Sequence, residues 1–508
     1  MQKKRVAKAD AKKQTADAKT TKKDIITVST SSSKGGILVD HKVPNAPSYT
    51  VLSAGDKPLS CYLMWSDIKD NHNKYYIAQG LVSSSGQHYL WTRYGRVGLD
   101  GVGTNQPCSS LDTLTALYNK KYREKTNKGY TEVKMALGNP NSTVEGEFKK
   151  IEPKKADESK LPKSKLDAKV QELISFIFDM NLIEQSIVQI GYDVKRLPLG
   201  QLDKETVLEG YKYLTEIEKV LNGKSKGDLA DLSAKFYTYI PHNFGMKHMS
   251  NFTIKTHEIL KQKIDLIQNL IDIKVAHKIV NPKKPKKQTS NPLDEKYDAL
   301  NCKLVTVKED SEDRKMVEQY LENSKDSRRL KLLDLFEVFR NGEDKTYNPQ
   351  KLGTKKLLWH GSRFSNFGGI LSQGLRIAPP EAPKTGYLFG KGAYFADMAG
   401  KSAPYCCADL SKNIGLFLLC EVALGNPRQL YQTDCDADNL PNGFHSTHGV
   451  GTKLPNPKEA IKIDKDIEVP FGKSIANPDK QANRSHNEYI VYNTNQVKMR
   501  YLCKVQFN

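Results

Sequence analysis

The sequence contains no apolar stretch long enough to cross a membrane. A transmembrane helix needs about 18 to 20 consecutive apolar residues, and no run in these 508 residues approaches that length. The amino-terminal segment is rich in lysine and has no apolar core of the kind found in secretory signal peptides. We therefore expect a soluble, non-secreted protein with no membrane partner.

The sequence also lacks the cysteine patterns that hold metal ions or disulfide frameworks. Its eight cysteines are scattered, with no Cys-x-x-Cys pair and no cysteine–histidine cluster at zinc-ligand spacing. This predicts free thiols in a reducing compartment and no bound metal. Cys406 and Cys407 are adjacent, which leaves redox sensing open, although small packing residues beside a pocket are the favoured interpretation.

Negative charge is in short supply along the chain. The chain has 58 aspartate and glutamate residues but 79 lysine and arginine residues, so its formal net charge is +21. Such an excess predicts an anionic partner, and we favour nucleic acid over a membrane surface. A chain of 508 residues is too long for one hydrophobic core, so we expect two to four domains.

The most informative part of the sequence is residues 358–397, which read LWHGSRFSNFGGILSQGLRIAPPEAPKTGYLFGKGAYFAD. Neither a helical nor a strand period runs through this segment, yet glycine, proline and aromatic residues recur at short intervals. Glycines let the backbone approach a ligand closely, and the lysines and arginines offer cations to phosphate or carboxylate. The segment therefore predicts the wall of a nucleotide-binding site.

This run resembles the NAD-binding half of the poly(ADP-ribose) polymerase catalytic domain. Residues 486–492, HNEYIVY, resemble the strand that carries the catalytic glutamate of that family. The three residues that define its polymerising members match as His360, Tyr394 and Glu488. The sequence is thus identified as a member of the DNA-dependent branch of the family in its short architecture, with a WGR module, a helical regulatory domain and an ADP-ribosyltransferase catalytic domain.

Composition and periodicity divide the chain into six segments. Basic, low-complexity sequence predicts disorder, short alternating runs predict strands, and apolar residues at i, i+3 and i+4 predict helices. The expected fold is therefore multidomain. Named by what the resemblance implies, the segments are a disordered basic amino-terminal arm (1–48), a small β-rich WGR-like DNA-binding module (49–150), a linker (151–165), an all-α regulatory bundle (166–280), a basic linker (281–291) and an α+β ADP-ribosyltransferase catalytic domain (292–508).

The tripeptide that gives the WGR module its name is present here as Tyr94-Gly95-Arg96, so tyrosine replaces tryptophan. The tyrosine keeps an aromatic face but offers less area for packing. The resemblance implies DNA contacts by Arg93, Tyr94 and Arg96. A solvated basic face is the alternative interpretation, and we favour contact with phosphates.

The resemblance also implies roles for the residues of the catalytic domain. Glu488 would bond the 2′-hydroxyl of the nicotinamide ribose, oppose the positive charge that develops as the bond to nicotinamide breaks, and orient the acceptor hydroxyl. His360 would anchor the adenine-side ribose, and Tyr394 would stack on the nicotinamide ring. The other implied residues are Gly361, Ser402 and Tyr405 around nicotinamide, Ser362, Asn366 and Arg376 on the adenosine side, and Lys391 at the acceptor site.

These features predict a nuclear enzyme of the DNA damage response that broken or nicked DNA activates. It would transfer ADP-ribose from its substrate NAD to protein acceptors, including itself, release nicotinamide and lengthen the chain. A mono-ADP-ribosyltransferase and a catalytically silent DNA-end-binding scaffold are the alternatives, and the complete set of three defining residues disfavours both. The helices of 166–280 would form a lid over the NAD pocket, with Asp265, Asn269 and Asp272 at its rim.

Overall fold

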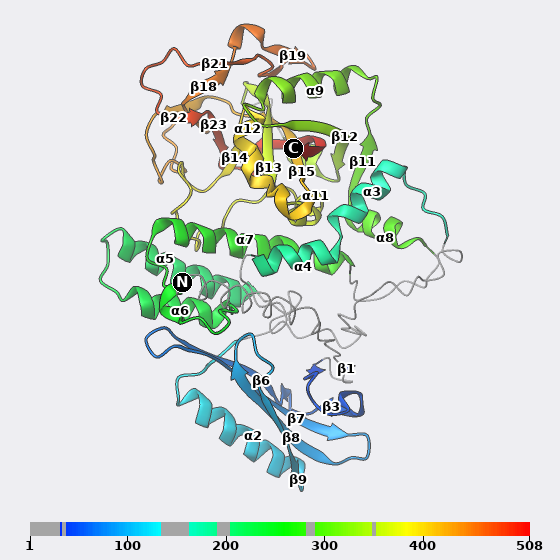
Figure 1. The fold of residues 1–508 in the computed structure, drawn as a ribbon, viewed down its shortest axis with the longest axis vertical. Helices are drawn as coiled ribbons and strands as arrows, with labels where there is room; N and C mark the ends of the chain where they lie inside the picture. The colour runs from blue at the N-terminus through cyan, green and yellow to red at the C-terminus, as the bar shows by residue number, and fades with distance from the viewer. Residues whose placement is uncertain (1–30, 33–36, 134–161, 190–203, 281–289, 348–351) are drawn as a thin grey trace, which may run out of the picture.

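The structure is a computed structural model that describes residues 31–32, 37–133, 162–189, 204–280, 290–347 and 352–508. A β-rich module, a layer of helices and an α+β domain follow one another along the long axis of the molecule (Figure 1). This arrangement confirms the predicted fold class. Most of the predicted basic arm (1–48) and of the two predicted linkers lies outside the described residues. Residues 37–48, which were predicted to be part of the disordered arm, instead pack on the β-rich module, because Val39, Val43 and Ala46 are buried in one cluster with Trp91.

The β-rich module is an antiparallel sheet with one helix packed against it. Its strand order is β10-β6-β7-β8-β9, and β3 pairs with β7. Leu114 and Tyr118 of the helix are buried with Leu63 and Leu90 of the sheet, and the Ser110 side chain caps the helix by accepting a hydrogen bond from Thr113 N. The elements are β3 (Tyr49–Val51), β6 (Ser60–Asp67), β7 (His72–Ser83), β8 (His88–Arg96), β9 (Val102–Cys108), α2 (Leu111–Thr126) and β10 (Thr131–Glu132).

The helical layer lies between the two β-containing parts of the chain (Figure 1). Its helices are α3 (Ala168–Ile177), α4 (Met180–Gln189), α5 (Lys204–Leu221), α6 (Leu229–Tyr239) and α7 (His257–Val280). The apolar stripe of α7 includes Ile264, Ile267 and Leu270, all buried in one core with residues of the catalytic domain. That shared core places α7 directly against α11 (Phe367–Gln373).

The catalytic domain is built on a seven-stranded sheet. Along β13 the side chains alternate, so that Leu357 and Trp359 pack beneath α9 (Glu312–Ser324) while Leu358 joins the core shared with the regulatory helices. All pairs in the sheet are antiparallel except β13 with β20. The strand order is β11 (Cys302–Thr306), β12 (Leu330–Arg340), β24 (Val497–Phe507), β15 (Ile414–Ala423), β13 (Lys355–Ser362), β20 (Ile467–Val469) and β19 (Ile461–Ile463).

A second sheet carries two of the predicted catalytic residues. Its order is β14 (Ala393–Phe395), β23 (Glu488–Val491), β17 (Ser446–Gly449) and β16 (Pro427–Leu430). Tyr394 stands opposite Ile490 in the antiparallel pair β14–β23, so the strand with Tyr394 lies beside the strand that Glu488 opens. None of the helices in the described ranges is long and apolar enough to cross a membrane.

Candidate active site

Backbone hydrogen bonds between the two sheets bring His360 and Tyr394 together. Trp359 N and Ala396 N each donate to the other residue's carbonyl oxygen, at 2.8 and 3.0 Å. His360 Nδ1 lies 2.9 Å from the carbonyl oxygen of Tyr394, and because a carbonyl only accepts, Nδ1 carries the proton. Burial lowers the pKa of His360, so the ring stays neutral and its Nε2 is an acceptor. The geometry fits an anchor for a ligand hydroxyl.

Glu488 is a buried carboxylate held between two cations. Its side chain sits at the start of β23, with Lys401 Nζ at 3.1 Å and Arg484 Nη1 at 4.0 Å from Oε1. The pairing matters because a buried charge without a partner is strongly destabilising. We did not predict Lys401, which lies in α12 (Ala399–Ser402) directly before the predicted ligand Ser402. Its proximity to Glu488 is a tertiary contact with no local sequence signal.

Asp397 fixes both neighbours of Glu488. Its Oδ2 accepts hydrogen bonds from Asn487 Nδ2 at 2.7 Å and from the Tyr489 hydroxyl at 3.2 Å. Asn487 Oδ1 in turn accepts from Gly451 N at 2.9 Å. Burial raises the pKa of Asp397. The strand that presents Glu488 is therefore held on both sides of this residue, a feature that sequence patterns did not reveal.

The predicted nicotinamide contacts Gly361, Ser402 and Tyr405 lie around the end of β13. A Cβ atom on Gly361 would collide with the backbone carbonyl oxygen of Ser402, so only glycine allows this close approach. Ser402 Oγ donates to the carbonyl oxygen of Trp359 at 3.2 Å. Tyr405 is 50% exposed, which leaves a ring face available. The side chain of Tyr394 is held in place by its hydroxyl, which donates to Gly390 O at 2.7 Å.

Two of the three predicted adenosine-side residues, Asn366 and Arg376, are bonded to the regulatory helix α7. Asn366 Nδ2 donates to Asn269 Oδ1 of α7 at 3.0 Å and to Ser362 Oγ at 3.1 Å. The Arg376 guanidinium forms an ion pair with Asp272 of the same helix. Two of the three predicted rim residues of the lid thus contact two of the predicted NAD ligands.

Asn366 offers a test of whether a polar ligand fits this site. Its Oδ1 is buried and finds no hydrogen-bond donor among the residues that the structure describes. Buried polar atoms are nearly always satisfied, so an unpaired acceptor here is what a site for a ligand hydroxyl or amine would leave. The residues present therefore fit a nucleotide substrate such as NAD.

The predicted acceptor residue Lys391 lies in the loop between α11 and β14. Its ammonium donates to the carbonyl oxygens of Pro379 and Pro380, at 3.2 and 2.7 Å. Burial, followed by the nearby charge of Lys384, lowers the pKa of Lys391. A role at the acceptor site stays a prediction.

Arg93 is buried in the β-rich module. Its Nε donates to Asp40 Oδ2 at 2.7 Å, and its Nη1 donates to the Tyr75 hydroxyl at 2.9 Å and to Asp100 O at 2.8 Å. A guanidinium already neutralised by a buried carboxylate has no charge to offer a phosphate. The structure assigns Arg93 to the core of the module, which corrects the expectation of a DNA contact.

Arg96 joins the β-rich module to the helical layer. Its guanidinium donates to the carbonyl oxygens of Gly245 and Lys247, which lie between α6 and α7, and to that of Asn71. The Tyr94 ring, by contrast, is 49% exposed. Of the three residues predicted to bind DNA, Tyr94 is therefore the one with a large free surface.

Three family models match consecutive parts of the chain. They are the WGR domain at residues 59–136, the poly(ADP-ribose) polymerase regulatory domain at 164–297 and the poly(ADP-ribose) polymerase catalytic domain at 311–507. Poly [ADP-ribose] polymerase 2 of Arabidopsis thaliana is 40% identical over 499 residues, which cover 94% of this chain and 78% of that protein. The chain belongs to the poly(ADP-ribose) polymerase family.

Other relatives agree with this assignment. Poly [ADP-ribose] polymerase 2 of Homo sapiens is 38% identical, with 94% of this chain and 86% of that protein covered. The Zea mays protein of the same name is 37% identical, with 94% and 75% covered. As a poly(ADP-ribose) polymerase, the chain is an ADP-ribosyltransferase that uses NAD as its substrate, and the predicted family and activity are confirmed.

Proposed function

We propose that this poly(ADP-ribose) polymerase is nuclear and is activated by broken or nicked DNA. It transfers ADP-ribose from NAD to protein acceptors, including itself, releases nicotinamide and elongates the polymer. The proposed regulation rests on helix α7. This helix contacts Asn366 through Asn269 and Arg376 through Asp272. It belongs to the helical layer that is hydrogen-bonded to the β-rich module.

A chain of buried contacts supports communication between the module and α7. Asn73 of β7 donates from Nδ2 to the carbonyl oxygen of His242 at 2.9 Å, and Lys263 of α7 lies 2.9 Å from His242 Nε2. Because His242 Nδ1 faces the carbonyl oxygen of Ile240 at 2.6 Å, Nε2 is the acceptor and Lys263 the donor. A shift of the module on DNA would therefore reach α7 through a directional hydrogen bond.

The chemistry follows from the residues around Glu488. Cleavage of the bond between nicotinamide and ribose develops positive charge at the ribose C1 carbon. The Glu488 carboxylate is suited to oppose that charge and to orient an acceptor hydroxyl, while Lys401 and Arg484 hold it in place. His360 is neutral, and its Nδ1 donates to Tyr394 O. Its Nε2 accepts a hydrogen bond from a ribose hydroxyl, so His360 binds the substrate and does not transfer a proton.

Incorporation of labelled NAD in the presence and absence of nicked DNA tests the proposal. A DNA-activated polymerase gives long, DNA-dependent polymer. A mono-ADP-ribosyltransferase gives a single labelled unit per site, and a silent scaffold binds DNA without incorporation. Either of the last two results would contradict the proposal.

We expect Arg96→Ala to lower the stimulation by DNA about 5- to 10-fold at saturating DNA, because it removes hydrogen bonds that couple the module to the helical layer. The measurement is polymer synthesis as a function of DNA concentration.

Arg123→Ala on the exposed face of α2 is the comparison variant. If Arg123 contacts a phosphate, its loss should weaken DNA binding and reduce the salt slope by about 0.9, while full stimulation returns at saturation. Full stimulation of Arg96→Ala by saturating DNA would show that Arg96 does not couple the module to the helical layer.

A further inference from the structure

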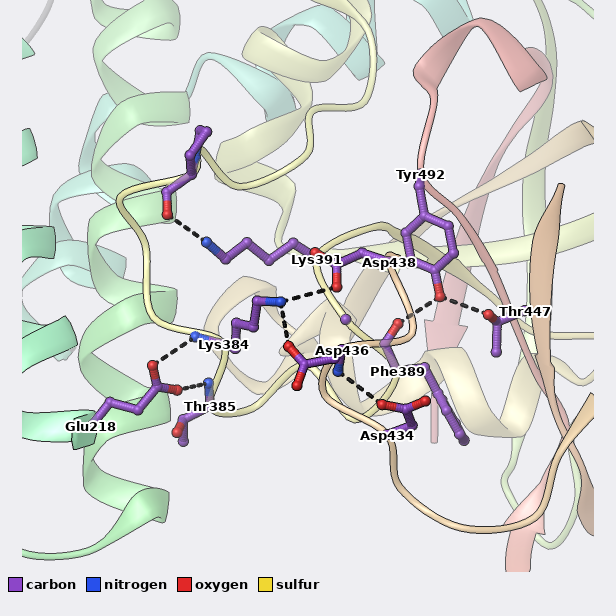
Figure 2. A network of polar contacts seen from close by, with 12 residues as sticks. Glu218, Lys384, Thr385, Phe389, Lys391, Asp434, Asp436, Asp438, Thr447 and Tyr492 are labelled. Atoms are coloured by element: carbon purple, nitrogen blue, oxygen red, sulfur yellow. Dashed lines mark hydrogen bonds and ion pairs between the residues drawn. The ribbon is translucent and has the colours of Figure 1, made fainter. Parts of the chain in front are cut away.

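A short acidic loop packs against the loop between α11 and β14. Residues 434–438 read DCDAD, and we call them the acidic loop. Lys384 of the α11–β14 loop reaches across to it, with its ammonium 2.6 Å from Asp436 Oδ1 and 3.2 Å from Asp438 Oδ1 (Figure 2). The hydrogen bond to Asp436 raises the pKa of Lys384, and the same contact lowers the pKa of Asp436. Both groups therefore keep their charges at neutral pH.

Backbone and apolar contacts join the same two loops. Asp434 N donates to the carbonyl oxygen of Leu388 at 3.0 Å, and Ala437 is buried in one cluster with Phe389. Inside the acidic loop, Asp434 Oδ1 accepts a hydrogen bond from Asp436 N at 3.0 Å (Figure 2). The acidic loop is therefore an internally bonded turn that supports the α11–β14 loop from within the catalytic domain.

The segment that the acidic loop supports also holds the side chain of Tyr394. Phe389 N donates to the Tyr394 hydroxyl at 3.0 Å, and that hydroxyl donates to Gly390 O at 2.7 Å. The Tyr492 hydroxyl donates to Phe389 O at 2.7 Å (Figure 2), so both backbone polar groups of Phe389 are bonded. A displacement of Phe389 and Gly390 would therefore move the ring of Tyr394, which is predicted to stack on nicotinamide.

Helix α5 also contacts the α11–β14 loop, but through backbone groups of the loop. Thr215 Oγ1 donates to Glu381 O at 2.8 Å. The carboxylate of Glu218 accepts hydrogen bonds from the N–H groups of Lys384, at 3.1 Å, and Thr385 (Figure 2). The ammonium of Lys384 instead contacts the acidic loop. A substitution of the Lys384 side chain therefore removes its contacts with the acidic loop and leaves the backbone groups that bond to α5.

We propose that Lys384, Asp436 and Asp438 form a latch that positions Tyr394 for the nicotinamide end of NAD. The latch holds the backbone of residues 384–390, which in turn holds the Tyr394 hydroxyl. Lys384 is thus a positioning residue that acts through Tyr394 and does not touch the reacting atoms. The inference rests on the role of Tyr394 within the proposed function.

The first test is hydrogen exchange of the full chain in the absence of NAD and DNA. Lys384→Ala should speed the exchange of peptides that contain Phe389 and Asp434 several-fold, because the N–H groups of both residues lie in the contact that the latch holds. Lys498→Ala is the matched control. Lys498 pairs with Asp344 at 2.6 Å, and the exposed fractions of these two side chains, 35% and 77%, match the 33% and 71% of the Lys384 pair with Asp436. Unchanged exchange in Lys384→Ala, or the same change in the control, would overturn the latch.

Steady-state kinetics at saturating nicked DNA test whether the latch positions the substrate. We expect Lys384→Ala to raise the KM for NAD about 3- to 5-fold, the scale of a partly exposed ion pair. The value of kcat should change less than about twofold, because Glu488 keeps its own partners. Lys384→Arg keeps the charge and should restore most of the wild-type KM. A lower kcat with an unchanged KM would contradict a role at the nicotinamide end.

A charge swap gives a test that a simple loss of packing cannot imitate. Lys384→Glu and Asp436→Lys should each raise the KM for NAD, because each places like charges together. The double variant Lys384→Glu/Asp436→Lys restores an ion pair of reversed sign, so its KM should return toward the wild-type value. A double variant no better than the single variants would exclude the latch. Failure of the proposed function is distinguishable, since it would appear as absent polymer synthesis in the wild type.

Discussion

Glu488→Gln should lower ADP-ribose transfer by roughly 10²- to 10³-fold, the scale on which enzymes lose rate when one electrostatic stabiliser is removed. The substitution keeps the shape of the side chain and part of its hydrogen bonding. It removes the negative charge that faces the developing cation and leaves the Lys401 ammonium, at 3.1 Å in the wild type, without its counterion. We expect the loss to appear in kcat. Binding of NAD should be retained, because His360 and the predicted adenosine-side residues are unchanged.

Glu421→Gln is the matched control for this experiment. Glu421 is equally buried in the catalytic domain, but it accepts a hydrogen bond from Tyr347 at 2.8 Å and lies 3.8 Å from Lys355. Glu421→Gln should change the free energy of unfolding more than it changes the turnover of each folded molecule. Single-turnover transfer from NAD, normalised to folded protein, distinguishes the two effects. Near-normal polymer synthesis by Glu488→Gln would exclude Glu488 as the catalytic carboxylate.

Removing the contacts of α7 should produce the second large effect, in the opposite direction. In the closed form Asn269 bonds Asn366 and Asp272 pairs with Arg376. If the closed form is favoured by about 3 kcal/mol, under one per cent of molecules can admit NAD. The double variant Asn269→Ala/Asp272→Ala removes both contacts and frees both predicted NAD ligands. We expect DNA-independent synthesis to rise by roughly 30- to 100-fold, while the maximal rate with DNA changes little.

An exposed position of the same helix provides the control. Gln262 faces solvent, and Gln262→Ala should leave synthesis without DNA at the wild-type level. The apparent affinity for NAD, measured without DNA, should rise in the double variant by the same factor as the activity. If the double variant folds and still requires DNA, α7 does not act as a lid and its contacts are structural.

Features with a strong period or a contiguous motif could be predicted from the sequence. The apolar stripe of α7 and the strand opened by Glu488 are local patterns, and the structure contains both elements. Arg93 could not be assigned, because its partner Asp40 lies 53 residues away and a basic residue in a strand has no local mark of burial. Lys401 was missed for the same reason, since its distance to Glu488 depends on how the tertiary fold places helix α12 beside the start of β23.

The close packing at Gly361 limits how this enzyme could evolve resistance to inhibitors. A compound that binds the backbone of Gly361 uses atoms that every amino acid possesses, so a substitution could defeat it only by adding a side chain. Any Cβ atom there would strike the carbonyl oxygen of Ser402, and backbone cannot move aside as a flexible side chain can. Resistance would have to arise elsewhere, for example at the half-exposed Tyr405. Compounds that rely on Gly361 should therefore have a high genetic barrier to escape.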